Sequence, residues 1–352
     1  MTKVHIIGGG IAGLALAGKL DPGQFDVTVY EQRPELPAVG TTLAMWAGAQ
    51  AALAGLGLLE SLQNRGSRLT SGALRDPAGR ALLSMEGEGL VGISRPALLQ
   101  LLDSAVPPTV QRLTQKVDRI PRGASVVVGA DGVHSAVRRQ AWGPGKAARP
   151  TPALAVRGVV PGTPAPDDVG EYWGRGNLFG LAPAAGEGTN WYASFRSSLG
   201  PWEVDVEEAL EQTRRLYAGH SPAVREVLAR ATPETSLAQR IWTAPPMRTY
   251  TRREVVLLGD AAHAMTPNLG RGACEALVDA VSLGALLNER PWVDALREYN
   301  RKRVIRTQQL KVASSLMGRV ALAGALQPLR DALLTQAGKG ASKRKSAAKT
   351  PE

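Results

Sequence analysis

The residues with the clearest chemical potential lie between Val255 and Gly272. An apolar run there ends in Gly259-Asp260, and a turn of small residues leads to Pro267 and Gly270. The run predicts a buried parallel strand, which places Asp260 at the carboxyl end of that strand, where open α/β sheets bind ligands. A carboxylate at this place accepts hydrogen bonds from ligand hydroxyls, and the glycines let backbone N–H groups approach a flat or anionic ligand.

A second group of glycines follows the first predicted strand, residues 4–7. The strand runs into the pattern Gly8-x-Gly10-x-x-Gly13, and a helix of small residues comes next. Gly8 permits a tight turn, Gly10 lets the backbone reach a pyrophosphate, and Gly13 allows the helix to pack closely. Because both the strand and the helix flank the glycines, the motif indicates dinucleotide binding.

An acidic residue completes this nucleotide-binding pattern. A second apolar strand, residues 27–30, ends at Glu31, which stands 18 residues after Gly13. A carboxylate at that place suits the hydroxyls of an adenosine ribose and argues against a 2′-phosphate in the pocket. The sequence therefore predicts a ligand built on adenosine diphosphate.

Length and composition restrict the class of protein. With 352 residues the chain has room for two or three domains. The first strand begins near Lys3, which predicts no signal peptide, and no apolar run reaches the ~18 residues that span a bilayer. The single cysteine, Cys274, excludes an internal disulfide and fits a reducing cytoplasm. The four histidines show no metal-ligand spacing, so we expect a cytoplasmic protein without a metal site or membrane attachment.

The net charge of +11 raises the question of nucleic-acid binding. Residues 339–352 carry five basic residues and one acidic residue, and this low-complexity tail is expected to be disordered. The other basic residues are dispersed and are not interleaved with aromatic residues, which number 16 in the chain. A solvated basic surface that favours anionic cofactors and acidic substrates explains this pattern better than nucleic acid.

The remaining pattern predicts a nucleotide-binding domain into which a β-rich domain is inserted. Strand-like segments cover residues 67–93, with turns at Asp76-Pro77 and Glu86-Gly87, and residues 153–197, while a helical pattern covers 204–231. The predicted limits are 1–66, 94–145 and 246–290 for the nucleotide domain, 67–93 and 146–245 for the β-rich domain, 291–335 for C-terminal helices and 336–352 for the tail.

Three motifs in this order resemble those of the group A flavoprotein monooxygenases, the family of para-hydroxybenzoate and salicylate hydroxylases. They are the glycine motif with Glu31, the turn from Gly129 to Gly132, and the Gly259-Asp260 segment with its Pro267 and Gly270-x-Gly272. The resemblance covers residues 3 to about 310. It implies an α/β fold in which a doubly wound, Rossmann-like FAD-binding domain is interleaved with a β-sheet substrate domain, followed by C-terminal helices.

The resemblance also implies roles for individual residues. The first motif would bind the adenosine diphosphate of FAD, and Asp260 would accept hydrogen bonds from the ribityl chain. Arg95 would contact the ribityl–phosphate region of FAD. Asp131 would belong to a turn associated with the binding of FAD and NAD(P)H. Backbone N–H groups near Gly270 would face the isoalloxazine. The full set of cofactor-binding candidates is Gly8, Gly10, Ile11, Ala12, Gly13, Glu31, Gln32, Arg33, Thr42, Leu43, Arg95, Val117, Asp131, Gly259, Asp260, Pro267, Gly270, Gly272 and Ala273.

In that family NAD(P)H reduces FAD, O₂ adds at C4a of the flavin, and the hydroperoxide transfers OH to an electron-rich ring. The cofactor carries the chemistry, and the protein orients it and excludes water. The expected partners are thus an aromatic or polycyclic small molecule and O₂, with a monomer or homodimer as the assembly. Arg271 and Pro267 are the catalytic candidates beside the ring, and the substrate candidates in the β-rich domain are Arg157, Tyr172, Trp173, Tyr192 and Arg196. Strand alternation predicts that about half of these face away.

Several features depart from the family pattern. Arg271 replaces the usual glutamine between the two glycines, where it either reaches the substrate or flavin carbonyls or faces solvent. Residues 118–125 are shorter than the usual β-hairpin meander, and the thioredoxin-like C-terminal domain of larger members is absent from this sequence. Cys274 and His263 are interpreted as packed structural residues, and Glu275 and Asp279 as carboxylates that complement a helix dipole.

Two other functions are compatible with a flavin-binding sequence. A flavin halogenase requires a Trp-x-Trp-x-Ile-Pro segment, and residues 242–245, Trp-Thr-Ala-Pro, do not match it. The other is an FAD-binding homologue that no longer hydroxylates and instead binds or protects a reactive intermediate. Both it and the monooxygenase retain the Gly259-Asp260 segment, so the sequence leaves them both open.

Overall fold

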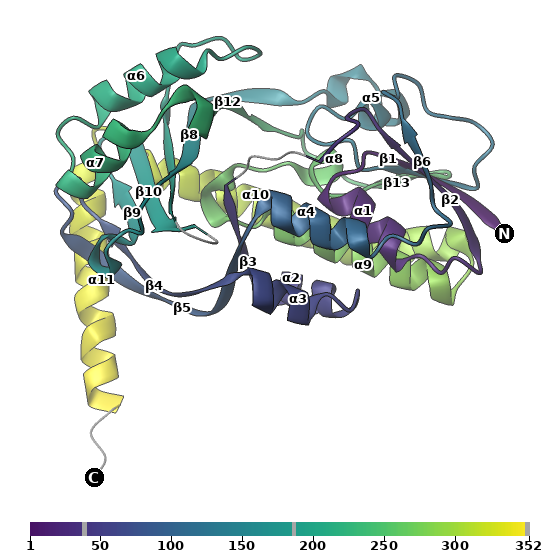
Figure 1. The fold of residues 1–352 in the computed structure, drawn as a ribbon, viewed down its shortest axis with the longest axis horizontal. Coiled ribbons are helices and arrows are strands. Elements are labelled where there is room, and N and C mark those ends of the chain that lie inside the picture. Colours follow the sequence, from purple (N-terminus) through teal and green to yellow (C-terminus); the bar gives the residue numbers. More distant parts are fainter. Residues whose placement is uncertain (37–40, 185–187, 349–352) are drawn as a thin grey trace. The chain divides into compact units, whose positions relative to one another are not determined.

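The computed structural model describes residues 1–36, 41–184 and 188–348 and divides into two compact units (Figure 1). Unit 1 comprises residues 1–66, 91–150 and 242–316, and unit 2 comprises 67–90, 151–241 and the chain from 317 onward. The chain passes between the units after residues 66, 90, 150, 241 and 316, and the limits expected from the sequence were 66, 93, 145 and 245. The C-terminal helices, expected as a separate segment from residue 291, divide between the two units.

Unit 1 is built on a six-stranded sheet in the order β13-β14-β7-β1-β2-β6. The strands are β1 Thr2–Ile7, β2 Phe25–Glu31, β6 Gln111–Thr114, β7 Val126–Gly129, β13 Thr251–Arg252 and β14 Val255–Leu257. All neighbours are parallel except β13, which pairs antiparallel with β14 at the edge. The central strands are runs of buried valine, isoleucine and leucine, as expected for a sheet covered on both faces.

The helices of unit 1 supply the rest of its core. They are α1 Ile11–Lys19, α2 Ala47–Ala54, α3 Leu59–Arg65, α4 Arg95–Ser104, α5 Ala136–Trp142, α8 Asp260–His263, α9 Gly272–Glu289 and the first part of α10 Trp292–Ala321. Figure 1 shows α1 beside α4 and α9. Small residues in α1 allow this close packing, since seven consecutive residues from Ile11 to Ala17 are buried. The short strand β3 Thr42–Met45 pairs with the last residues of β5.

Unit 2 contains an antiparallel-rich sheet in the order β12-β8-β11-β10-β9-β4-β5. Its strands are β4 Ser67–Arg75, β5 Ala81–Ser94, β8 Arg149–Val160, β9 Gly170–Trp173, β10 Asn177–Pro183, β11 Thr189–Arg196 and β12 Ser236–Thr243. Alternate residues of β8 to β11, among them Phe179, Trp191 and Phe195, form one core with α6 Val206–Leu216 and α7 Pro222–Arg230. The intervening residues therefore point to the other face of the sheet.

The structure corrects three expectations about elements. No turn forms at Glu86-Gly87, because β5 is continuous from Ala81 to Ser94. The helical pattern over 204–231 is two helices, since Pro222 starts α7 and cannot continue α6. The helix α11, Gln327–Ala348, extends through most of the tail that was expected to be disordered. The edge strand β6 was not predicted, because it has only four residues and most of them are exposed.

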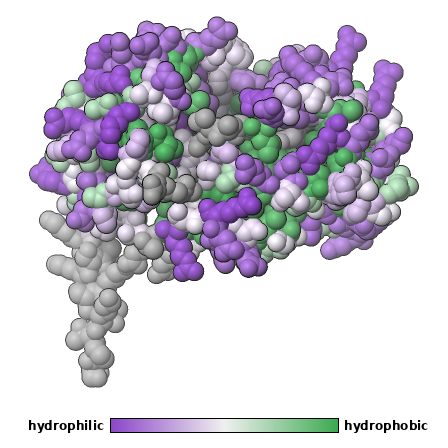
Figure 2. All heavy atoms as spheres, viewed as in Figure 1, coloured by the Kyte–Doolittle hydropathy of each residue, from purple (hydrophilic) through white to green (hydrophobic). Residues whose placement is uncertain are grey.

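In the described part of the chain, no helix is long and apolar enough to cross a membrane. On the face drawn in Figure 2, hydrophilic side chains predominate and apolar ones lie between them.

Candidate functional site

Four parallel strands of unit 1 end at one edge of the sheet, and each is followed by one of the motifs. β1 leads to Gly8, β2 ends at Glu31, β7 leads to Asp131 and β14 leads to Asp260. Backbone hydrogen bonds keep the first turns in register: the Ala130 N–H donates to the Ile7 carbonyl at 2.8 Å. β1 lies between β2 and β7, so the chain reverses its direction of winding there, and a crevice forms at such a switch point.

The glycine turn after β1 is shaped by close backbone approaches. Gly8 has φ +109°, and a Cβ there would lie 2.3 Å from the Ala130 oxygen. A Cβ on Gly13 would lie 1.8 Å from the Gly8 oxygen. Gly10 differs, because nothing lies within 4 Å of a Cβ placed on it, and no side chain caps α1 at this residue. The N-terminal amides of α1 are thus accessible to an anion, as a pyrophosphate requires.

Glu31 is fixed by the glycine turn itself. Its Oε2 accepts the Gly9 N–H at 2.7 Å, and its Oε1 accepts the Arg33 N–H at 3.0 Å. The carboxylate therefore stands beside the start of α1, where a ribose attached to the pyrophosphate would lie. Gln32 and Arg33 are exposed next to it.

The helix α5, which follows the turn after β7, contains a buried arginine that the sequence did not reveal. Arg138 is fully buried; its Nε donates to the Lys146 oxygen at 2.7 Å and its Nη1 to the Ala261 oxygen at 2.7 Å. Burial lowers the pKa of Arg138 to about 10. One side chain thus ties α5 to the start of α8. An arginine in a short helix usually lies in solvent, so no sequence signal distinguishes it.

Asp131 lies in the turn between β7 and α5. Its Oδ2 accepts the Val137 N–H at 3.1 Å, whereas its Oδ1 is buried without a hydrogen-bond partner among the described residues. A buried carboxylate oxygen without a donor calls for a ligand or water at that position.

In the Gly259-Asp260 turn, the Asp260 residue is exposed and Gly259 is buried. Gly259 is buried with φ +54°, and Asp260, the first residue of α8, is exposed at the carboxyl edge. The Gly259 N–H donates to Oδ2 of Asp279 at 2.9 Å. The turn is therefore held from beneath, while the Asp260 side chain is available to a ligand.

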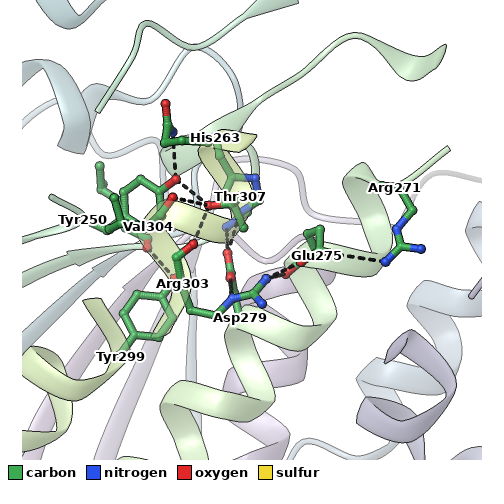
Figure 3. A network of polar contacts seen from close by, with 12 residues as sticks. Tyr250, His263, Arg271, Glu275, Asp279, Tyr299, Arg303, Val304 and Thr307 are labelled. Carbon is green, nitrogen blue, oxygen red and sulfur yellow. Dashed lines mark hydrogen bonds and ion pairs between the residues drawn. The ribbon is translucent and has the colours of Figure 1, made fainter. Parts of the chain in front are cut away.

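Asp279 belongs to a buried charged network (Figure 3). Its Oδ2 lies 2.6 Å from Nε2 of His263, and its Oδ1 accepts from Nε of Arg303 at 2.6 Å. Arg303 also pairs with Glu275 at 2.5 Å. Although burial raises it, the pKa of Asp279 is held below its usual value by His263 and Arg303. Glu275 lies in the first turn of α9, where a carboxylate was expected to complement the helix dipole, whereas Asp279 lies beyond the first turn; both are also buried partners of Arg303.

Arg271 lies at the outer end of this network. Its Nη2 is 3.3 Å from Oε1 of Glu275, and its guanidinium carbon is 5.1 Å from the centre of the Trp46 ring. Its side chain is 22% exposed, and its Nε is buried without a partner among the described residues. A guanidinium fixed on two sides keeps its remaining N–H groups in a defined direction.

The remaining cofactor candidates lie on elements of unit 1. Ile11 and Ala12 are buried, so only their backbone amides are available to a ligand. Arg95 is exposed at the start of α4, and Pro267 and Gly270 are exposed, with Gly270 in the left-handed region at φ +60°. The partly buried members are Thr42, Leu43, Val117, Gly272 and Ala273.

Cys274 is a buried thiol near the start of α9. Its Sγ donates to the Ala44 oxygen at 3.2 Å, and burial raises its pKa. A buried, protonated thiol reacts with a disulfide reagent more slowly than an exposed thiolate does. We therefore expect Cys274 in the folded protein to react at least ~100-fold more slowly than in the urea-unfolded chain. Absorbance of the released thiolate measures both rates, and equal rates would contradict the buried position.

The substrate candidates divide between the two faces of the unit 2 sheet. Arg157 and Tyr192 lie directly opposite each other on β8 and β11, and Arg196 follows on the same face of β11. Tyr172 is corrected: it is fully buried in the core on the other face, where its hydroxyl donates to the Asp168 oxygen at 2.9 Å. Trp173 shares the face of Tyr192 but is buried beneath Arg330.

Glu171, which the sequence analysis did not select, joins this face. Its Oε1 accepts from the Tyr192 hydroxyl at 2.5 Å, and its Oε2 accepts from Nε1 of Trp173 at 2.7 Å. The alternation Glu171-Tyr172-Trp173 is the available signal, since it places the acid and the tryptophan on one face.

Comparison with known proteins identifies the family. Residues 103–314 match the family described as FAD binding domain, and residues 6–42 match the NAD(P)-binding Rossmann-like domain. The 2-heptyl-3-hydroxy-4(1H)-quinolone synthase of Pseudomonas aeruginosa is 31% identical, with 90% of this chain and 89% of that protein covered. This chain belongs to the FAD-dependent aromatic monooxygenases. FAD is its cofactor and NAD(P)H its co-substrate, as the three motifs predict.

Other relatives agree with the assignment. The aurachin C monooxygenase/isomerase of Stigmatella aurantiaca is 29% identical, with 90% of this chain and 89% of that protein covered. The crystal structure of Klebsiella pneumoniae HpxO complexed with FAD and uric acid has a TM-score of 0.86 at 26% identity, covering 95% of this chain and 93% of that one. The predicted fold class and the predicted monooxygenase function are therefore confirmed.

Proposed function

We propose that this monooxygenase binds FAD at the carboxyl edge of the unit 1 sheet and an aromatic substrate on the Tyr192 face of the unit 2 sheet. The observation that carries the cofactor site is the convergence of four strand ends, with Gly8, Glu31, Asp131 and Asp260 at one edge. FAD, reduced by NAD(P)H, supplies the activation of O₂ when it is bound.

The chain's own residues have separate tasks in this proposal. The first amides of α1 bind the pyrophosphate, and Glu31 accepts hydrogen bonds from the adenosine ribose. Asp260 accepts from the ribityl hydroxyls, and the backbone around Gly270 donates to the ring. Trp46 and Glu275 hold the Arg271 guanidinium in place. Arg271 therefore offers a fixed positive charge to an anionic or enolate group of the substrate.

Substrate groups are assigned to the second unit. Arg157 and Tyr192 share one face with an enclosed carboxylate, whereas the opposite face is filled by the core. We infer that the enzyme acts in the cytoplasm, which its single cysteine suits, and that it is a monomer or homodimer.

The cofactor site is tested by Asp260→Ala. Because Asp260 is exposed and none of the described hydrogen bonds uses its side chain, the variant should fold normally yet retain less than about one tenth of the FAD of the native protein. The ratio of flavin to protein absorbance after gel filtration measures retention. Glu254→Ala, which removes another exposed carboxylate of unit 1, is the matched control and should retain FAD. Full retention by Asp260→Ala would remove Asp260 from the site.

The reaction is tested by a substrate screen on the FAD-loaded enzyme. Substrates should stimulate NAD(P)H oxidation and yield products heavier by one oxygen. A flavin-containing protein whose NAD(P)H oxidation responds to no phenol or heteroaromatic compound would favour a binding protein that has lost hydroxylation.

A further inference from the structure

The C-terminal segment carries almost all of the net charge of the chain. Residues 299–352 contain 12 basic and two acidic residues, whereas residues 1–298 contain 30 basic and 29 acidic residues. One of the two acidic residues, Asp331, is already paired with Arg330 at 2.7 Å. The positive charge is thus concentrated in this segment, and such a field attracts an anionic partner.

The helix α11 is anchored to unit 2 by its inner face. Arg330 is buried; its Nη2 donates to the Trp173 oxygen and its Nη1 to the Ala321 oxygen, both at 2.8 Å. Further along the helix, a Cβ on Gly338 would lie 2.7 Å from the Leu82 oxygen, so the helix passes close to β5 (Figure 1). Two contacts eleven positions or fewer apart in the helix therefore fix which face of α11 points outward.

The outward face of α11, and of the turn that leads into it, is apolar although it is exposed. Leu326 is 68% exposed, Leu329 is 59% exposed and Leu333 is 58% exposed, and their spacing places them on one side of the helix. We call the exposed residues between 324 and 337 the α11 outer face. They are Gly324, Ala325, Leu326, Pro328, Leu329, Ala332, Leu333, Gln336 and Ala337.

This face has the reverse of the usual polarity of a surface helix. A surface helix normally turns its charged residues outward and its apolar residues toward the core. Here the α11 outer face contains no charged residue, whereas the inner face holds the pair of Arg330 and Asp331. A contiguous exposed apolar patch of this kind indicates a contact with another surface.

Basic residues follow the α11 outer face along the same helix. The helix continues to Ala348, and its last ten residues include no acidic residue and four basic ones, Lys339, Lys343, Arg344 and Lys345. Exposed leucines beside clustered lysine and arginine are typical of a helix that lies in the interface of an anionic bilayer. A second copy of the chain would add positive charge at the contact, whereas anionic lipid neutralises it.

We propose that α11 attaches the enzyme to an anionic lipid surface. The α11 outer face contacts the acyl chains, and the basic residues that follow it lie among the headgroups. The attachment is peripheral, since no described helix is long and apolar enough to span a bilayer. It departs from the sequence-based expectation of no membrane attachment, because that expectation considered spanning segments and an interfacial helix needs none. It does not depend on the proposed function, because α11 carries none of the proposed cofactor or substrate residues.

Vesicle flotation tests the attachment with the full-length, FAD-loaded enzyme. One set of vesicles is phosphatidylcholine alone, and the other contains about 30% phosphatidylglycerol; flavin absorbance of the floated fraction measures binding. We expect binding to the anionic vesicles to be at least ~10-fold tighter than to the neutral ones. Raising the salt from about 0.1 M to about 0.5 M should weaken it, because salt screens the attraction between the basic segment and the headgroups.

The double variant Leu329→Gln/Leu333→Gln separates apolar contact from adsorption by charge. Both leucines are exposed, so flavin retention and circular dichroism should match the native enzyme, whereas binding to anionic vesicles should weaken at least ~10-fold. The matched control is Leu216→Gln/Leu237→Gln, which replaces two exposed leucines of unit 2 outside α11 and should bind like the native enzyme.

Three results would overturn the attachment: no binding to either kind of vesicle, equal binding to both kinds, or unchanged binding by Leu329→Gln/Leu333→Gln. The last result would mean that charge alone adsorbs the enzyme. If the native enzyme binds no vesicles and light scattering shows a dimer that this variant converts into a monomer, the α11 outer face belongs to a second copy of the chain instead.

Discussion

Replacing Gly13 with alanine is expected to lower the free energy of unfolding of the FAD-free protein by about 3 kcal/mol. The added Cβ would lie 1.8 Å from the Gly8 oxygen and 3.3 Å from Cγ2 of Ile6. The first of these contacts is with backbone, so no side-chain rotation relieves it, and the turn or the helix must move. Urea unfolding followed by circular dichroism measures the change.

Gly10→Ala is the matched control within the same motif. A Cβ at Gly10 meets no protein atom within 4 Å, and φ is −83°, so alanine is compatible with the fold. In the proposed site, this open space is where the pyrophosphate would approach the backbone. We therefore expect unchanged unfolding of the FAD-free protein but FAD binding weakened by about tenfold, or 1.4 kcal/mol.

The pair of variants separates two roles of one motif. Stability lost in Gly10→Ala, or kept in Gly13→Ala, would contradict the packing described for the turn. FAD affinity kept in Gly10→Ala would show that the ligand does not approach this residue.

The edge where the four strand ends meet could be predicted from the sequence because its signals are local. Gly8, Gly10 and Gly13 follow a strand at fixed spacing, and Asp260 ends an apolar run. Parallel strands bring such positions to one edge whatever lies between them in the chain. Asp131 follows another buried strand, β7, so the same rule places it at this edge.

The supporting residues could not be predicted in this way. Arg138 and Arg303 are buried, yet each lies in a helical segment that reads as solvent-exposed, and their partners are 123 and 24 residues away. Tyr172 and Tyr192 look equivalent in sequence, and only the register of β9 and β11 shows that they face opposite sides. Contacts between residues that are distant in the sequence determine where these four side chains lie. The local sequence pattern does not reveal such contacts.

Asp279→Ala is expected to destabilise the FAD-free protein by about 3–5 kcal/mol, the cost of leaving a buried charge without its partner. Asp279 is fully buried, and its loss removes the acceptor of Arg303 Nε, of His263 and of the Gly259 N–H together. Glu275 alone would remain to neutralise Arg303. Chemical denaturation of the FAD-free protein gives the free energy difference.

A surface carboxylate gives the comparison. Asp294→Ala removes an exposed ion pair with Arg297 and should change stability by less than about 0.5 kcal/mol. A loss below 1 kcal/mol in Asp279→Ala would mean that the buried network contributes no more than such a surface pair.

Flavin retention then distinguishes Asp260 from Asp279. Asp260→Ala should lose FAD while the protein stays as stable as the native one, because its carboxylate is exposed. Asp279→Ala should lose both, because the Gly259 turn that presents Asp260 is hydrogen-bonded to it. Loss of stability with native FAD retention would separate the network from the cofactor site. The joint loss would show that the buried charges hold the ligand-binding turn in place.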